Sequence, residues 1–157
     1  MATTGGDFGK AFTANMSALG LPAPSSLFGS IQAAASNIAT MLSALKTLGP
    51  GATVAELIDA TTALEVLSVV GALSASFYVG ACVGSLVVAA NASLTCTSGA
   101  SAAATARTTA ARVGLVIPQS MLAFIQRHPE VVIDSPSRGN YAFLASRVQP
   151  SGQRAAA

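Results

Sequence analysis

The feature that most constrains this chain is a long stretch without charge. No Asp, Glu, Lys or Arg lies between Glu65 and Arg107. Inside this stretch, the 25 residues 66–90 read VLSVVGALSASFYVGACVGSLVVAA. As a helix this run would be roughly 37 Å long, and about 20 apolar residues are enough to cross a bilayer core. The run therefore predicts either a membrane-spanning helix or a core helix that protein surrounds on every side.

A hydrogen-bonding motif marks the start of this helix. Thr53-Val54-Ala55-Glu56 has the spacing of a capping box, in which the Thr53 hydroxyl and the Glu56 carboxylate each accept from the other residue's backbone N–H. Nothing in the sequence clearly stops the helix before Asn91. We therefore predict one long hydrophobic helix over about 54–90, capped by Thr53 and Glu56.

The rest of the chain also has helical spacing. Apolar residues recur every three or four positions from Leu27 to Leu48, which predicts an amphipathic helix that ends at Gly49-Pro50-Gly51. Shorter helices are predicted over 102–113, 118–127 and 141–148. The predicted fold class is all-α, with four or five helices, one of which is the long central hydrophobic helix.

The same patterns divide the chain into three parts. Glycines and prolines punctuate residues 1–24, which predicts a flexible N-terminal arm, although a short helix from Asp7 to Leu19 would fit there. Residues 25–148 are predicted to form the helical domain. Residues 149–157 are predicted to be a disordered tail.

Small residues recur at every fourth position of the hydrophobic run. Two of them are glycines, each of which costs about 1 kcal/mol in a helix interior relative to alanine, and alanine is abundant elsewhere in this chain. Small residues four apart allow two helix backbones to approach closely, and in lipid this packing drives association. We predict a membrane helix-packing stripe, whose partner is either the 27–48 helix or the same stripe in other copies of a homo-oligomer: Ser68, Ala72, Ser76, Gly80 and Gly84.

Hydroxyl and amide side chains offer a lining for a pore between such helices. A lumen lined by them carries no fixed charge and would pass small ions with weak charge preference. The candidate lining residues lie on both long helices: Ser36, Asn37, Thr40, Ser74 and Ser85.

Composition argues against several other functions. The single histidine, His128, precedes a proline, where a helix normally ends. No nucleophile, metal-binding or phosphate-binding motif accompanies it, so we predict that the chain is not an enzyme and has no cofactor or metal. The six arginines after residue 106 are scattered without a basic run, which argues against nucleic acid as a partner. Cys82 and Cys96 are interpreted as small apolar residues, with a disulfide as the minor alternative.

The sequence resembles a known class, the small pore-forming effectors of bacterial type VI secretion systems. The matching features are a glycine zipper at Ser76, Gly80 and Gly84, the uncharged 66–90 run, richness in small residues, and the lack of a basic and apolar signal sequence at the N-terminus. The resemblance implies secretion without a cleaved signal peptide and delivery by a secreted tube protein or chaperone. It also implies insertion into membrane lipid at a target cell's inner membrane, loss of ion gradients, and a membrane immunity protein in the producing cell.

Two other functions remain open at the level of sequence. One is a non-toxic small integral membrane protein, either holin-like or an accessory subunit. The other is a soluble helical interaction module that buries the apolar run as its hub.

Overall fold

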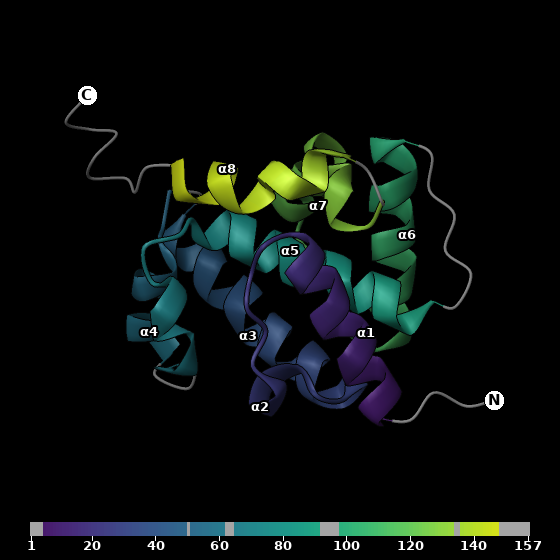
Figure 1. Ribbon diagram of the computed structural model, residues 1–157, viewed down its shortest axis with the longest axis horizontal. Coiled ribbons are helices and arrows are strands. Elements are labelled where there is room, and N and C mark those ends of the chain that lie inside the picture. Colours follow the sequence, from purple (N-terminus) through teal and green to yellow (C-terminus); the bar gives the residue numbers. More distant parts are fainter. Residues whose placement is uncertain (1–4, 50, 62–64, 92–97, 134–135, 148–157) are drawn as a thin grey trace.

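Helices make up the regular structure of the described chain, so the all-α prediction is confirmed. The computed structural model describes residues 5–49, 51–61, 65–91, 98–133 and 136–147 (Figure 1). Within these ranges eight α-helices are present, more than the four or five predicted, and the only β contact is an isolated bridge between Thr53 and Ser74. The α-helices are α1 Gly5–Ala18, α2 Ser25–Phe28, α3 Ile31–Leu48, α4 Val54–Thr61, α5 Ala75–Ala90, α6 Gly99–Arg112, α7 Gln119–Arg127 and α8 Tyr141–Arg147. Three 3-10 helices complete them: η1 Glu65–Val70, η2 Pro129–Val131 and η3 Pro136–Asn140.

Helix α5 lies at the centre of this arrangement. Helices α1, α3, α4, α6 and α7 and the short η2 all contact it, and Figure 1 shows it crossing the middle of the molecule. All its residues from Ala75 to Val87 except Ser76 are buried. Because α5 is apolar on every face, only a position surrounded by other helices removes all of its apolar surface from water.

Residues 54–90 do not form one helix, and this prediction was wrong. Helix α4 ends at Thr61, η1 follows over Glu65–Val70, and α5 begins only at Ala75, after a turn. The Ser74 hydroxyl caps α5 by accepting from the Phe77 N–H at 3.4 Å. No helix among the described residues combines the length and apolarity needed to cross a membrane.

Backbone hydrogen bonds join the turn before α5 to the start of α4. The turn before α5 lies against the first residues of α4, so the chain folds back on itself. The bonds run from Val54 N–H to Leu73 O at 2.9 Å, from Ala55 N–H to Gly71 O at 3.0 Å and from Ala75 N–H to Ala52 O at 2.9 Å.

Size explains why the chain bends here. A helix over 54–90 would be roughly 55 Å long, whereas a domain of this length has a radius of gyration of about 15 Å. A straight helix would leave much of its apolar surface outside the core, and folding back at 71–74 avoids that cost.

The N-terminal segment also differs from the prediction of a flexible arm over 1–24. Residues 5–18 form α1, which contacts α5, α2 and α3. Its inner face carries Phe8, Phe12 and Met16, each buried, and Leu19 just beyond is fully buried too. The Phe12 and Phe28 rings stack with centroids 4.6 Å apart. These apolar residues lie three or four positions apart, which is a helical pattern. Their burial against α5 stabilises the helix more than the flanking glycines destabilise it.

Local signals set the ends of the other helices. The helix predicted from Leu27 to Leu48 is split between α2 and α3, because the Ser30 hydroxyl caps a new helix at Ile31 by accepting from the Ala33 N–H at 3.2 Å. Gly49 ends α3 with a φ of 95°, a conformation that favours glycine. Helix α6 begins at Gly99, earlier than predicted, and α7 ends at Arg127 as predicted. The predicted tail over 149–157 lies outside the described residues.

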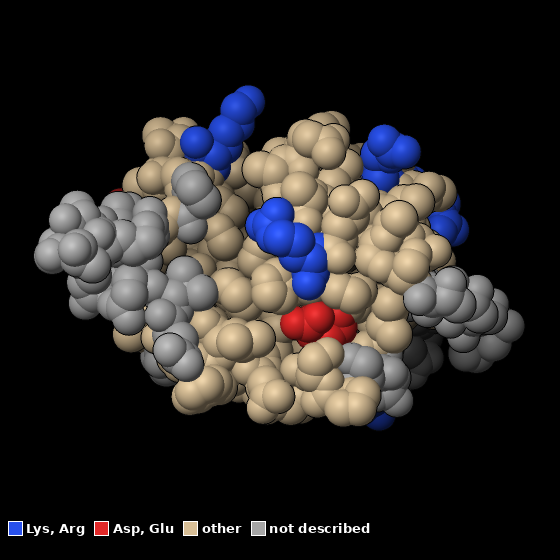
Figure 2. All heavy atoms as spheres, turned by 90° about the horizontal axis from the view of Figure 1, so that it is seen from above, with Lys and Arg blue, Asp and Glu red and all other residues tan. Residues whose placement is uncertain are grey.

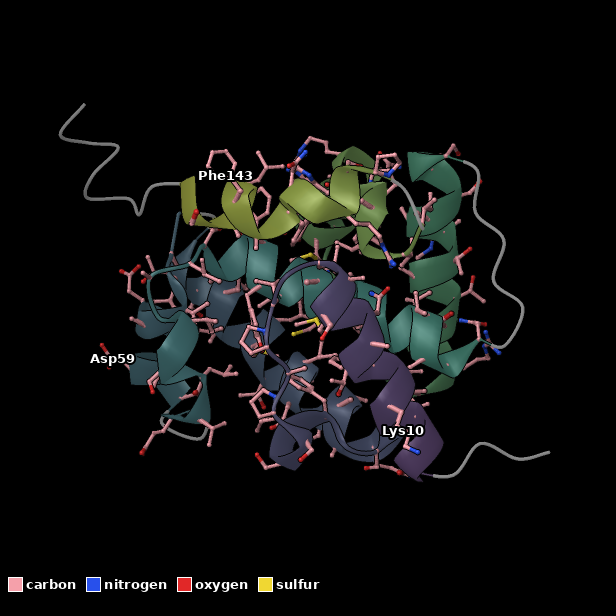
Figure 3. All side chains as sticks on the ribbon, in the orientation of Figure 1. Lys10, Asp59 and Phe143 are labelled. Carbon is pink, nitrogen blue, oxygen red and sulfur yellow. The ribbon has the colours of Figure 1, made fainter. Side chains whose placement is uncertain are left out.

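Charged groups are sparse on the surface. Seen from above, the face that carries α7 and α8 has broad uncharged areas around a few charged groups, and near its middle an acidic group lies beside a basic one (Figure 2). Lys10 on α1 and Asp59 on α4 project from the periphery, as does the apolar Phe143 on α8, which is 58% exposed (Figure 3). Only 9% of the residues are charged, against about 25% in a typical soluble domain, so like-charge repulsion between copies is weak.

Candidate functional site

The two glycines of α5 lie against the C-terminal third of the chain. A Cβ added at Gly80 would overlap the ring of Phe124 on α7. A Cβ added at Gly84 would lie 2.5 Å from the backbone oxygen of Val131 in η2 and 2.6 Å from its Cβ. Real Cβ atoms do not approach neighbours this closely, so both glycines permit close packing within the chain.

The predicted five-residue stripe is not one surface. Ser68 lies in η1 and Ala72 in the turn before α5, and both are exposed. Ser76 is half-buried in the first turn of α5, whereas Gly80 and Gly84 are buried within the helix. The break at 71–74 therefore separates the first two members from the other three.

The predicted pore-lining residues do not meet in this fold. Ser36 is exposed on α3, and Thr40, four residues on, donates from its hydroxyl to the Ser36 carbonyl at 3.2 Å. Asn37 donates to the Leu27 carbonyl at 2.9 Å. Ser74 and Ser85 are buried near opposite ends of α5, roughly 16 Å apart along the helix.

The predicted cap of α4 has the reciprocal geometry of a capping box. The Thr53 N–H donates to the Glu56 carboxylate at 2.8 Å, and the Glu56 N–H donates to the Thr53 hydroxyl at 3.4 Å. The cap fixes the start of α4 beside the 71–74 turn.

A buried polar network connects α1 to α5 and to the segment after α7. The Asn15 side chain, 4% exposed, donates to the Ser85 hydroxyl at 2.9 Å and to the Val131 carbonyl at 2.8 Å. Its carbonyl oxygen accepts from the Arg138 guanidinium, which also donates to the Glu130 carbonyl at 3.0 Å. One side chain thus bonds to buried groups on α5 and η2 and to the half-buried Arg138 of η3, and we call these residues the Asn15 network.

Removing the centre of the Asn15 network is expected to destabilise the fold. Asn15→Leu leaves the Ser85 hydroxyl, the Val131 carbonyl and the Arg138 guanidinium short of a partner, with an expected loss of about 2 kcal/mol in the free energy of unfolding. Urea denaturation followed by circular dichroism measures this loss. Asn140→Leu, at an exposed asparagine of η3, is the matched control, and equal losses in the two variants would contradict the role of the network.

An aromatic cluster covers the first turns of α5. Phe77 contacts Phe124, His128 and Tyr141, with ring centroids 5.0, 4.8 and 5.2 Å away. The Tyr141 hydroxyl donates to the Phe77 carbonyl at 2.6 Å. Burial, and then the nearby Glu130 carboxylate, raise the pKa of Tyr141 well above its ordinary value, so this hydroxyl keeps its proton.

His128 is part of this packing. Its Nδ1 lies 3.2 Å from a carboxylate oxygen of Glu130, and its ring stacks at a tilt on Phe124. It also ends α7, as its position before Pro129 predicts. Within the described ranges no group of three or more His, Cys, Asp or Glu side chains is placed to hold a metal ion. Cys82 is a fully buried free thiol in α5, and Cys96 lies outside the described residues.

The sequence analysis missed the Asn15 network and the partners of the two glycines. Asn15 lies on the short helix that the sequence allowed over Asp7 to Leu19, but 123 residues separate it from Arg138. No local pattern reports such a pairing. The apolar spacing of Phe8, Phe12 and Met16 is the one signal that marks α1 as a core helix.

The candidate functional element is therefore α5 together with the residues that enclose it. Its enclosure is built from close glycine packing, an aromatic cluster and the Asn15 network, all within one chain. No family model, no curated protein and no solved structure matches this chain.

Proposed function

We propose that this protein is a membrane-active toxin that carries α5 inside a helical bundle and releases it into a lipid bilayer. One observation carries the proposal: α5 is apolar on every face and enclosed on every side. It lies in a stretch without charge that extends from residue 66 to residue 106. Such a helix is as compatible with a bilayer interior as with the core of a bundle.

Release on this proposal requires a change in the path of the chain. Helix α5 has 16 residues, which makes it roughly 24 Å long, shorter than the roughly 30 Å hydrocarbon core. Straightening of the 71–74 turn joins η1 to α5 and restores the 25-residue run at 66–90. Val66 of η1 is 50% exposed in the bundle, so its transfer from water to lipid would offset part of the energy needed to break the turn's hydrogen bonds.

The proposal extends to the class that the sequence resembles, the type VI pore-forming effectors. In a bilayer, Gly80 and Gly84 would exchange their contacts with Phe124 and Val131 for contacts with another helix, since small residues favour helix association in lipid. Secretion inside a tube protein or with a chaperone, action at the inner membrane of a target cell, homo-oligomer formation and an immunity protein all belong to this proposal.

A soluble interaction module is the second candidate, and the glycine contacts favour it. Gly80 and Gly84 already serve packing inside the chain, so their presence does not require a membrane. The two candidates predict different results with lipid vesicles. A soluble module keeps α5 inside the bundle, whereas the toxin inserts it into the bilayer.

A single tryptophan on α5 distinguishes the two candidates. The chain contains no Trp, so Phe77→Trp places a unique fluorophore near the middle of 66–90. With vesicles loaded with potassium, we expect potassium release together with fluorescence quenching by lipids brominated in their acyl chains. Phe143→Trp, on the exposed face of α8, is the matched control and is expected to resist this quenching. Vesicles that stay sealed while the Phe77→Trp fluorescence is unchanged would exclude the toxin and support the soluble module.

A further inference from the structure

A cavity of about 330 Å³ between α3, α5 and α7 combines an apolar floor with two cations. Leu42, Met121 and Phe124 supply apolar walls and are at least nine-tenths buried. Lys46 of α3 and Arg127 of α7 line the same cavity and are exposed. The volume falls in the range of small-molecule sites, about 300–1,000 Å³.

The two cations lie toward one end of this cavity. Residues 31–39 of α3 line a second hollow with residues 112–115, while residues 42–49 of α3 meet residues 118–127 in the cavity itself. Helices α3 and α7 therefore run in the same direction. Lys46 and Arg127 both lie in the last turns of their helices. The apolar walls extend from these cations toward Pro118.

Neither cation has an opposite charge among the described residues. The chain has six acidic residues, and none of the described residues that line the cavity is acidic. The ion pair in the described part of the chain joins His128 to Glu130 and includes neither cation. Two positive charges that have no acidic partner among the described residues, at one end of an apolar cavity, match a ligand with an anionic head and an apolar tail.

We propose that this cavity binds a single-chain anionic amphiphile, with its carboxylate or phosphate between Lys46 and Arg127 and its alkyl chain along Leu42, Met121 and Phe124. The proposal does not rest on the toxin function, because binding occurs on the closed bundle in the absence of a membrane. Carboxylate and phosphate heads share this chemistry, and they correspond to fatty acids and to phosphate-bearing single-chain lipids respectively.

Methionine methyl NMR tests the proposal, with decanoate and decyl phosphate as probes and decylammonium as the control of opposite charge. In protein labelled with [¹³C-methyl]methionine, we expect a saturable shift of the Met121 resonance with an anionic probe. The resonance of Met16, fully buried on α1, is expected to be unmoved, which reports that the fold is intact. Decylammonium is expected to bind at least about fivefold more weakly, given the modest strength of exposed ion pairs.

Charge-removing variants complete the test. Lys46→Gln with Arg127→Gln is expected to raise the dissociation constant of the anionic probe about fivefold or more. Lys10→Gln with Arg107→Gln removes two exposed cations elsewhere and is expected to change it less than twofold. Binding of only one of the two anions would assign the head group. No saturable Met121 shift with either anion, equal affinity for decylammonium, or equal effects of the two double variants would overturn the proposal.

Discussion

Gly84→Ala is expected to lower the free energy of unfolding by about 2 kcal/mol, in the range for an overpacked core. A Cβ at this position would lie 2.5 Å from the backbone oxygen of Val131. Backbone cannot rotate away as a long side chain can, so α5 and η2 must separate, which also disturbs the bond from Asn15 to the same oxygen. Urea denaturation measures the loss.

Gly139→Ala is the matched control for this substitution. A Cβ at Gly139, in η3, meets nothing within 4 Å, and the expected change is within about 0.5 kcal/mol. If Gly84→Ala were as stable as the Gly139→Ala variant, the close packing of α5 on η2 would be contradicted.

The same substitution separates the two roles proposed for Gly84. Alanine remains small enough for close helix packing in lipid, so Gly84→Ala is expected to weaken the bundle while keeping vesicle leakage at or above the wild-type rate. Leucine at this position would disturb the packing of both the closed bundle and the helices in lipid. Gly84→Leu alone therefore does not distinguish the two roles.

The sequence was informative wherever the signal was local. The Thr53–Glu56 cap, the end of α3 at Gly49 and the end of α7 before Pro129 each depend on residues a few positions apart. The uncharged run also predicted a helix that avoids water on all sides, and α5 is such a helix. These features follow from backbone hydrogen bonding and from hydrophobicity, which single sequences report directly.

The sequence was misleading wherever distant segments decide the outcome. The turn at 71–74 forms because its backbone groups bond to Val54 and Ala55, which lie some 15 to 20 residues earlier. The two glycines pack against Phe124 and Val131, in the C-terminal third of the chain, whereas the sequence predicted the 27–48 helix or another copy as their partner. Tertiary packing of this kind outweighs local propensity, and one sequence does not reveal which segments will meet.

A disulfide across the α4–α5 hairpin is expected to block membrane activity. A Cβ at Gly71 would lie 3.5 Å from the Cβ of Ala55, within the separation that a disulfide accepts. Ala55→Cys with Gly71→Cys, in a background of Cys82→Ala and Cys96→Ser, therefore crosslinks α4 to the turn before α5. Closing a loop of this size is expected to stabilise the bundle by about 3 kcal/mol.

The crosslink opposes insertion for an electrostatic reason. Gly71 lies inside the 66–90 run, so in a straightened helix it would enter the bilayer. The disulfide would hold α4 beside it, and α4 carries Glu56 and Asp59. Carrying carboxylates into the hydrocarbon costs several kcal/mol. Reduction of the disulfide removes this restraint without changing the sequence.

Potassium release from lipid vesicles by this variant, measured before and after reduction with dithiothreitol, tests the central claim most directly. Ala55→Cys alone, in the same background, controls for the reductant. The oxidised protein is expected to release potassium at least about tenfold more slowly than the reduced protein, a difference that corresponds to about 1.4 kcal/mol, while the control shows no change. Equal release before and after reduction would contradict the claim that α5 must leave the bundle to act.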